Sequence, residues 1–400
     1  MPDTPWLTMI GLGEDGPEGL SPASRAALDA AEIVMGAARH LSLLPGLAGK
    51  TVTWPVPFAD GIDRLLGYRG RRVVVLASGD PFWCGAGAVL ARHLQAGEWR
   101  AFPGPSTFSL AAARLGWPLE RTVCLGLHAA PFARLRPHLA LGARAIVLLR
   151  DGAAVGELAA WLSAQGFGAT RITVMEALGG PRERIRRVQA QGYDLDGVAH
   201  PVCAALEVHG SGAPLTLASG RADDLFDHDG QITKRPVRAL TLSALAPRTG
   251  EHLWDIGAGS GSVALEWLLC GPAMRATAIE AEAARADRIA TNAAALGVED
   301  RLSLVRGRAP EALDGLEAPQ AVFIGGGLSA ALLAHLGAML AEGTRIVANA
   351  VTLESEALLT TWQADHGGTL LRIDLAEVAP LGSKRGWKAA YPITQWSGVI

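Results

Sequence analysis

The stretch Leu253 to Ser262, LWDIGAGSGS, carries the strongest local signal in this 400-residue chain. Its first residues are apolar, as in a buried strand, and Gly257, Gly259 and Gly261 follow at alternate positions before a helical pattern begins. Because glycine has no Cβ, the backbone can turn tightly there and approach a ligand closely. The spacing therefore predicts a strand, a glycine turn and a helix.

A second residue indicates which ligand such a turn would hold. The next strand-like run ends at Glu280, about 25 residues after Asp255, and is placed to accept hydrogen bonds from two ribose hydroxyls. The glycine spacing is GxGxG, whereas a dinucleotide site has GxGxxG. An ordinary turn without a ligand and an NAD site remain as alternatives. The pattern resembles class I S-adenosylmethionine (SAM) methyltransferases, so we expect Asp255, the three glycines and Glu280 to bind SAM.

Apolar runs of strand length alternate with helical patterns along the whole chain, which favours parallel α/β sheets covered on both faces. A turn-rich segment around 209–230 divides two such series, so we expect a first module over 1–210, a linker over 211–229 and a second module over 230–400. Strands are expected at 7–13, 72–80, 144–152, 171–179 and 201–210, then at 252–259, 275–282, 301–307, 320–327, 344–351 and 370–378, with one more possible within 389–396.

Composition excludes several classes of protein. The formal charge is −3, made of +2 over residues 1–210 (20 basic, 18 acidic) and −5 over the rest (16 basic, 21 acidic). Neither half has the basic excess of a nucleic-acid-binding protein, which disfavours an RNA-modifying enzyme. The four cysteines lie far apart without a CxxC pair, so we expect no metal site and no disulfide framework.

Targeting signals are not evident either. The first residues lack the basic start of a signal peptide, and no apolar run approaches the ~18 residues that span a bilayer. We therefore expect a cytoplasmic protein with no membrane partner.

Four segments of the second half together resemble the decarboxylating precorrin methyltransferases of cobalamin synthesis. They are GQITKRPVRALTLSAL (230–245), GRAPEAL (307–313), VFIGGG (322–327) and NAVTLES (349–355). The resemblance implies that Gln231, Thr233 and Ala309 contact SAM. Arg308 departs from the acidic or small residue common in that family, which places a side-chain hydrogen bond to the adenine in doubt.

Three glycine-rich turns of the first half are placed where open α/β sheets form ligand crevices. They are MIGLGEDG (9–16), ASGDPFWCG (77–85) and PGPSTFSLAAARLGWPLE (103–120), and structural turns would explain them equally well on their own. Together they resemble the tetrapyrrole (corrin and porphyrin) methylases, a class III SAM fold with two subdomains, here about 1–116 and 117–210. The resemblance implies that Gly79, Asp80, Pro81 and Ser106 bind SAM.

One chain with both modules in this order resembles the bifunctional, decarboxylating precorrin methyltransferases. The resemblance implies one SAM per module, a small-molecule tetrapyrrole substrate and a homo-oligomer. It also implies methylation of carbons 5 and 15 of precorrin-6B and decarboxylation of the ring C acetate to give precorrin-8. Carbon 15 methylation and decarboxylation are assigned to the second module and carbon 5 methylation to the first. An alternative keeps catalysis in residues 230–400 and makes the first half a substrate-holding or assembly module.

The substrate carries many carboxylates, which guanidinium and ammonium groups pair with well. The candidates for binding it are Lys234, Arg235 and Arg238, while Lys384 and Arg385, in a segment expected to arch over the site, and Glu354, a possible proton handler, are candidates for catalysis. Each basic residue fits a solvated surface charge equally well, and Glu354 fits an acid favoured at a helix N-terminus. Arg150 and Asp151 are similar candidates in the first module.

Overall fold

The computed structural model describes residues 5–400, which divide into two compact units. One unit runs to Phe132 and resumes over His138–Pro214, and the other comprises Ala133–Pro137 and Leu215–Ile400. The stretch expected as a linker is largely packed on the second unit. There the backbone N–H groups of Gly220 and Arg221 each donate to the Glu266 carboxylate at 2.8 Å, and Phe226 is buried in the core.

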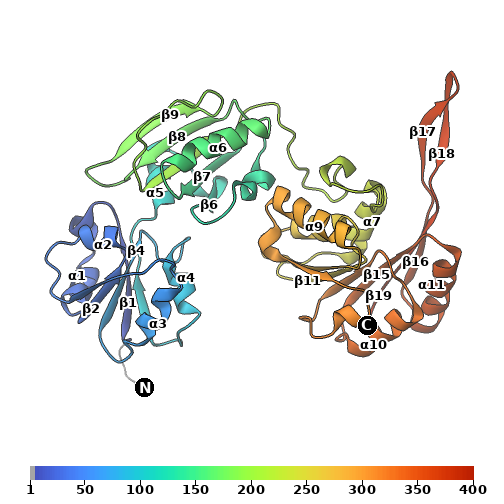
Figure 1. Cartoon of the computed structure of the whole chain (residues 1–400), viewed down its shortest axis with the longest axis horizontal. Coiled ribbons are helices and arrows are strands. Elements are labelled where there is room, and N and C mark those ends of the chain that lie inside the picture. The colour runs from blue at the N-terminus through green and yellow to red at the C-terminus, as the bar shows by residue number, and fades with distance from the viewer. Residues whose placement is uncertain (1–4) are drawn as a thin grey trace. The chain divides into compact units, whose positions relative to one another are not determined.

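The first unit contains two sheets, each with its own helices (Figure 1). The first sheet is fully parallel, in the order β3-β2-β4-β1-β5, and its central strands β1 and β4 are buried along nearly their whole length. Its elements are β1 (Leu7–Leu12), α1 (Pro22–Asp29), β2 (Ile33–Gly36), α2 (Ala38–Ser42), β3 (Lys50–Thr53), α3 (Asp60–Leu66), β4 (Val73–Ser78), α4 (Ala86–Ala91) and β5 (Trp99–Phe102).

The second sheet of this unit departs from the expected parallel arrangement. Its order is β6-β7-β10-β8-β9, and only β6 and β7 are parallel. The prediction of a parallel sheet is wrong here because β10 inserts antiparallel between β7 and β8. The elements are α5 (Thr107–Leu115), β6 (Val123–Gly126), β7 (Arg144–Leu149), α6 (Ala153–Ala164), β8 (Arg171–Glu176), β9 (Arg184–Gln189) and β10 (Val202–Glu207).

The second unit is built on a seven-stranded sheet in the order β13-β12-β11-β14-β15-β19-β16. The first five strands are parallel, as expected, and β19 runs antiparallel between β15 and β16. Its helices are α7 (Arg235–Leu245), α8 (Ser262–Leu268), α9 (Ala283–Leu296), α10 (Ala330–Met339) and α11 (Leu353–His366). Its strands are β11 (His252–Ile256), β12 (Arg275–Glu280), β13 (Leu302–Arg306), β14 (Ala321–Ile324), β15 (Arg345–Ala350), β16 (Thr369–Ile373) and β19 (Ile393–Val399).

Apolar clusters cover both faces of this sheet. One contains Trp267 and Phe323, and the other contains Trp254 and Trp396, all nearly inaccessible to solvent. The strand expected over 370–378 is divided between β16 and β17 (Ala376–Leu381), and β17 pairs only with β18 (Lys384–Ala389). Short 3-10 turns lie at Gly16–Gly19, Leu119–Arg121, Phe132–His138, Asp223–Leu225, Glu299–Arg301 and Glu311–Leu313. Within residues 5–400, every helix falls short of the length and apolarity that crossing a membrane requires.

Candidate active sites

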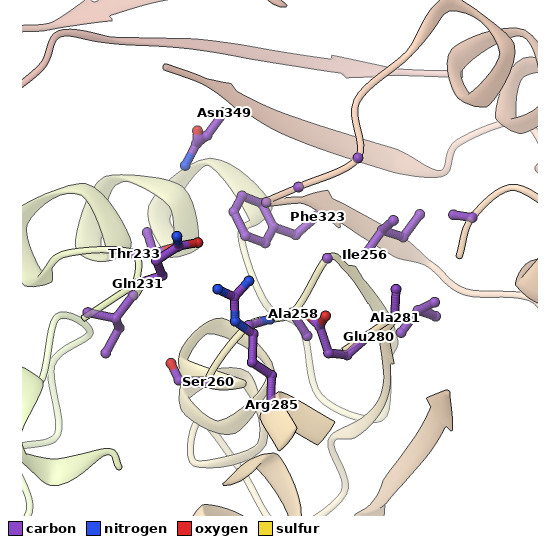
Figure 2. Close-up of a pocket in the computed structure, with 18 of the residues that line it drawn as sticks. Gln231, Thr233, Ile256, Ala258, Ser260, Glu280, Ala281, Arg285, Phe323 and Asn349 are labelled. Carbon is purple, nitrogen blue, oxygen red and sulfur yellow. Dashed lines mark hydrogen bonds between the residues drawn. The ribbon is translucent and has the colours of Figure 1, made fainter. Parts of the chain in front are cut away.

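A cavity of about 470 Å³ opens in the second unit where the parallel strands end. Figure 2 shows its lining. This lining comes largely from the glycine turn 257–260, from 279–281 at the end of β12, from 307–309 after β13, from 325–327 after β14, and from 230–234 before α7. Carboxyl ends of parallel strands are the usual place for a ligand crevice in α/β sheets.

The glycine turn after β11 requires glycine on steric grounds. Gly257, Gly259 and Gly261 have φ of +67°, +59° and +75°, in the left-handed region that other residues rarely adopt. A Cβ on Gly257 would lie only 2.6 Å from the Cα and N of Gly326. The two glycine-rich turns are therefore in direct backbone contact, and backbone atoms form the part of the cavity floor between Gly257 and Gly326.

Glu280 ends β12 and ties the glycine turn to its own strand. Its Oε2 accepts from the backbone N–H of Gly259 at 2.8 Å, and its Oε1 accepts from the N–H of Glu282 at 2.9 Å. The side chain is nearly buried but lines the cavity. A carboxylate has about four lone-pair positions, so two acceptor positions remain for the hydroxyls of a ligand.

A larger cavity, of about 770 Å³, lies in the first unit. Three backbone segments converge beneath it: a Cβ on Gly11, near the end of β1, would lie 1.7 Å from the carbonyl oxygen of Gly79 and 2.4 Å from the N of Gly104. The N–H of Gly104 donates to that same Gly79 oxygen at 3.0 Å. This approach of three backbones is possible only without side chains.

Among the residues expected at this cavity, Gly79, Asp80 and Ser106 line it. Asp80 Oδ1 accepts from the N–H of Phe82 at 2.8 Å, and Ser106 Oγ accepts from Ser109 N at 3.0 Å, so both side chains also hold their own turns. The same cavity is lined by aromatic and apolar side chains, as a large flat ligand requires: Trp54, Phe58, Leu76, Trp83, Phe108 and Met175.

Two family profiles match the two units separately. The family described as tetrapyrrole (corrin/porphyrin) methylases matches residues 7–192, and the family described as precorrin methyltransferase domain matches residues 224–399. A precorrin-6Y C(5,15)-methyltransferase [decarboxylating] from Sinorhizobium sp is 50% identical over 400 residues, covering 98% of this chain and 96% of that protein. The chain belongs to this family.

Shorter relatives match one part of the chain each. A cobalt-precorrin-7 C(5)-methyltransferase from Salmonella typhimurium is 28% identical over 193 residues, covering 48% of this chain and 94% of that protein. A probable cobalt-precorrin-6B C(15)-methyltransferase (decarboxylating) from Pyrobaculum calidifontis is 40% identical over 142 residues, covering 34% of this chain and 72% of that protein.

As a SAM-dependent precorrin C-methyltransferase, the chain needs a nucleoside site. The cavity of the second unit, called the second cavity below, fits one. The backbone floor at Gly257 admits no side chain, and Glu280 offers free carboxylate acceptor positions beside it. Gln231, Thr233 and Ala309, named from the family resemblance, all line this cavity, and so does Arg308. Gly261 does not line it and packs against Ile289 instead.

Asp255 lies beneath the glycine turn rather than in the cavity lining of this precorrin methyltransferase. Its Oδ2 accepts from Ala264 N at 2.9 Å, so it anchors the first turn of α8. Its Oδ1 has no hydrogen-bond partner among residues 5–400. The pKa of Asp255 is raised to about 7, mainly by burial; the Ala264 N–H bond lowers it and the nearby Glu280 charge raises it.

We expect Asp255→Asn to change how stability depends on pH. A folded-state pKa above the ~3.9 of an unfolded chain means that the folded protein binds the proton more tightly. The wild-type free energy of unfolding therefore decreases as pH rises from about 4 to about 7, on the order of 4 kcal/mol in total. The variant lacks this term, so its unfolding temperature relative to wild type should rise across that window in scanning calorimetry. A difference that is the same at every pH would contradict the assignment.

Residues 230–234, which line one side of the cavity before α7, are held by ionic interactions of Asp229 that sequence analysis missed. Asp229 accepts from Arg285 Nε at 2.9 Å, from Arg288 Nη1 at 3.3 Å and from the backbone N–H of Gln231 at 3.0 Å. The Arg285 bond is the main cause of the lowered pKa of Asp229. Arg285 also lines the cavity, and only its position on α9, one turn after Glu282, signals this in the sequence.

Arg238 cannot bind substrate, and that prediction is wrong. Its side chain is 0% exposed, and its guanidinium donates to Glu266 at 2.7 Å, to Asp223 at 3.0 Å and to the carbonyl of Thr233, with the ring of Phe226 4.9 Å away. Arg238 instead fixes the segment that leads into the cavity. Its spacing from Thr241, Leu242 and Leu245 marks the buried face of α7.

The other charged candidates are distributed differently. Lys234 lines the cavity, whereas Arg235, Glu354, Lys384 and Arg385 are exposed and are not part of its lining within residues 5–400. The β17–β18 hairpin, which carries the last two, extends away from the sheet in Figure 1 rather than arching over the cavity. Glu354 lies in the first turn of α11, in keeping with a helix N-terminal acid.

The cavity of the first unit, called the first cavity below, contains a cluster of charged side chains that the sequence did not reveal. The nearly buried Glu14 accepts from Arg39 of α2 and from Arg182 Nη2 at 3.0 Å, joining the two subdomains. Burial lowers the pKa of His40 to about 4, and the neighbouring Arg39 adds to this effect, so His40 is neutral at pH 7. Arg39 donates to Ser78 Oγ at 2.7 Å, which also lies 2.9 Å from His40 Nε2.

The three remaining candidates in the first unit differ. Arg150 lines the cavity and pairs with Asp151 and Glu157. Asp151 does not line it; its Oδ1 accepts from Ala154 N at 3.0 Å at the start of α6. Pro81 is buried outside the lining, with its carbonyl accepting from Gly87 N.

Proposed function

We propose that the second module methylates carbon 15 of precorrin-6B and decarboxylates its ring C acetate, and that the first module methylates carbon 5 to give precorrin-8. The observation that carries this proposal is that each folding unit has its own cavity with a glycine floor and matches its own family. The names of the two shorter relatives support the same division and an order in which carbon 15 comes first, since one names precorrin-6B and the other precorrin-7.

SAM, when bound, supplies the methyl group that leaves its sulfur and bonds to the meso carbon. The chain's task is to hold the reactants in line and exclude water, and positioning of this kind contributes up to ~7–11 kcal/mol. In decarboxylation the bond to the carboxyl carbon breaks, its electron pair passes into the conjugated macrocycle, and a proton later converts the remaining methylene to a methyl group. Glu280 and the glycine turn position the donor. Methyl transfer to the meso carbon requires no strong base.

The proposal of one SAM per module is tested by titrating the full-length chain with S-adenosylhomocysteine in a calorimeter. We expect two equivalents to bind. Glu280→Ala loses two hydrogen bonds to a charged acceptor, worth about 1.5–3 kcal/mol each, so one of the two affinities should fall at least about 10-fold. Glu282→Ala, whose exposed side chain neighbours the site without lining it, is the matched control.

Product analysis separates the two modules. Glu280→Ala should no longer methylate carbon 15 of precorrin-6B at the wild-type rate, yet should methylate carbon 5 of a precorrin that is already methylated at carbon 15 and decarboxylated. Methylation of carbon 15 at the wild-type rate would refute the division of labour. A single equivalent in the wild type, lost in Glu280→Ala, would favour the alternative in which only the second module is catalytic.

A further inference from the structure

Three polar side chains from separate segments meet beside the second cavity. Thr241 lies on α7, Asn349 near the end of β15, and Gln395 on β19, directly across from Asn349 in the antiparallel ladder. Asn349 Nδ2 donates to Thr241 Oγ1 at 2.9 Å, and Gln395 Nε2 donates to Thr241 Oγ1 at 3.1 Å and to Asn349 Oδ1 at 2.9 Å.

These residues occupy positions where apolar side chains would be expected. Thr241 is 0% and Gln395 3% exposed, and Thr241 shares the buried face of α7 with Val237 and Leu245. Burying amides and hydroxyls costs free energy unless each is paired, and a paired network fixes one arrangement of its members. A network of this kind at the edge of a cavity therefore serves to hold one of its members in place.

Counting donors shows which member is held. Gln395 Nε2 has two hydrogens, and both are used, on Thr241 and on Asn349. Asn349 Nδ2 uses one hydrogen on Thr241, and residues 5–400 provide no acceptor for the second. Rotating the Asn349 carboxamide by half a turn would place its NH₂ group against the NH₂ group of Gln395, and neither group can accept a hydrogen bond. The network therefore holds Asn349 with one N–H free.

Asn349 also faces the cavity. It is half-buried and belongs to the lining, and Figure 2 shows its nitrogen turned towards the side where Thr233 and Phe323 lie. The glycine turn, Glu280 and Ala309 follow β11, β12 and β13, whereas β15 lies two strands beyond β11, roughly 10 Å away, on the opposite half of the sheet. The nucleoside end of the donor occupies the first half, so Asn349 is placed on the side of the methyl acceptor.

We propose that Asn349 binds a carboxylate oxygen of the ring C acetate, whose carboxyl group is lost as carbon dioxide. Thr241 and Gln395 are positioning residues that orient the free N–H of Asn349. This inference rests on the proposed function of the second module. It adds a substrate contact and no new chemical step.

A neutral donor suits a carboxylate that must leave as carbon dioxide. The negative charge disappears from the acetate as the bond breaks, so any group that binds this charge strongly stabilises the ground state more than the transition state. A lysine or arginine would have the larger effect of this kind, because its positive charge adds a Coulomb attraction to the hydrogen bond. An amide N–H orients the acetate with a smaller penalty.

The test compares Asn349→Leu and Asn349→Asp in the full-length chain with precorrin-6B. Asn349→Leu removes the donor at similar size, and we expect kcat/KM for carbon dioxide release to fall about 10- to 100-fold. Asn349→Asp opposes a second negative charge to the acetate, so its loss should exceed that of Asn349→Leu. The dissociation constant for S-adenosylhomocysteine and methylation at carbon 5 should stay within about twofold of wild type in both.

The positioning role has its own readout. Thr241→Val removes the hydroxyl that accepts hydrogen bonds from both amides, and the side-chain volume stays nearly the same. This variant should raise the KM for precorrin-6B about 5- to 10-fold without changing the affinity for S-adenosylhomocysteine. Thr241→Ser retains the hydroxyl and should restore the wild-type KM. A purely structural role would lower the unfolding temperature in Thr241→Val without this selective change in KM.

Three results would overturn the inference: carbon dioxide release in Asn349→Leu at the wild-type rate, a milder loss in Asn349→Asp than in Asn349→Leu, or a parallel loss of S-adenosylhomocysteine affinity, which would place Asn349 on the donor side. Glu280→Ala keeps the two proposals separate. If that variant still methylates carbon 15 at the wild-type rate, the proposed function of the second module is wrong. If it does not, while Asn349→Leu still releases carbon dioxide at the wild-type rate, only the inference about Asn349 fails.

Discussion

Gly257→Ala should abolish decarboxylation and methylation at carbon 15 while methylation at carbon 5 persists. The new Cβ would lie 2.6 Å from the Cα and N of Gly326 and 2.7 Å from its oxygen, all backbone atoms that cannot rotate away. The left-handed φ of +67° adds roughly 1–2 kcal/mol of strain for an alanine. The two turns that form the cavity floor must separate, and a displacement of about 1 Å at a reacting centre costs ~100-fold in rate.

The measurement is carbon dioxide released from precorrin-6B, together with S-adenosylhomocysteine titration. We expect one of the two binding events to disappear and carbon dioxide release to fall by at least about 100-fold. Gly250→Ala is the matched control, because Gly250 also has a left-handed φ, +86°, but apart from its chain neighbours no atom of residues 5–400 lies within 4 Å of its added Cβ. Equal losses in both variants would show that backbone strain, and not separation of the two turns that form the cavity floor, causes the effect.

Gly11→Ala should have the opposite consequence, loss of methylation at carbon 5 with decarboxylation retained. Its Cβ would lie 1.7 Å from Gly79 O and 2.4 Å from Gly104 N, the two atoms that hydrogen bond to each other beneath the first cavity. Relief requires the ends of β1 and β4 to move apart, although they pair residue by residue from Leu7 to Leu12. This overlap is tighter than that at Gly257, so the expected loss of carbon 5 methylation is at least about 100-fold.

This prediction is measured with the precorrin already methylated at carbon 15 and decarboxylated, so that the second module is not needed. Gly67→Ala, at the end of α3, is the control, since its nearest neighbour would lie 3.5 Å from the new Cβ. Carbon dioxide release from precorrin-6B by Gly11→Ala shows that the second unit remains folded. Normal carbon 5 methylation in Gly11→Ala would mean that the floor of the first cavity is not where the donor binds.

The parts of the site that could be predicted are those encoded in short contiguous stretches. Glycines at alternate positions after an apolar strand permit one kind of turn, and an acid at the end of the next strand lies beside it wherever two parallel strands are neighbours. Gly257, Gly259 and Glu280 are therefore where the sequence placed them, and Gln231, Thr233 and Ala309 followed from the family resemblance. Asp255 lies one layer deeper than expected, because alternate residues of a strand face opposite sides of the sheet.

The predictions that failed involve charges and strand direction. The prediction that Arg238 binds substrate fails because its partners, Asp223 and Glu266, lie 15 and 28 residues away in the chain, where no local pattern reveals them. An apolar run predicts that 201–210 is a strand but carries no information on its direction, and β10 is antiparallel to both of its neighbours. Lys384 and Arg385 lie on a hairpin whose course depends on its pairing, which a local pattern does not specify.

By itself, the amino-acid sequence determined the two α/β modules, the glycine turns and the family, because these depend on steric freedom and on periodicity over a few neighbouring residues. Only the tertiary structure decided which polar side chains meet: Glu14 with Arg39 and Arg182, Asp229 with Arg285, and Asn349 with Thr241 and Gln395. The reason is physical. A buried polar group is stable only beside its partner, and in each set the partners come from separate segments that strand order and helix packing bring together.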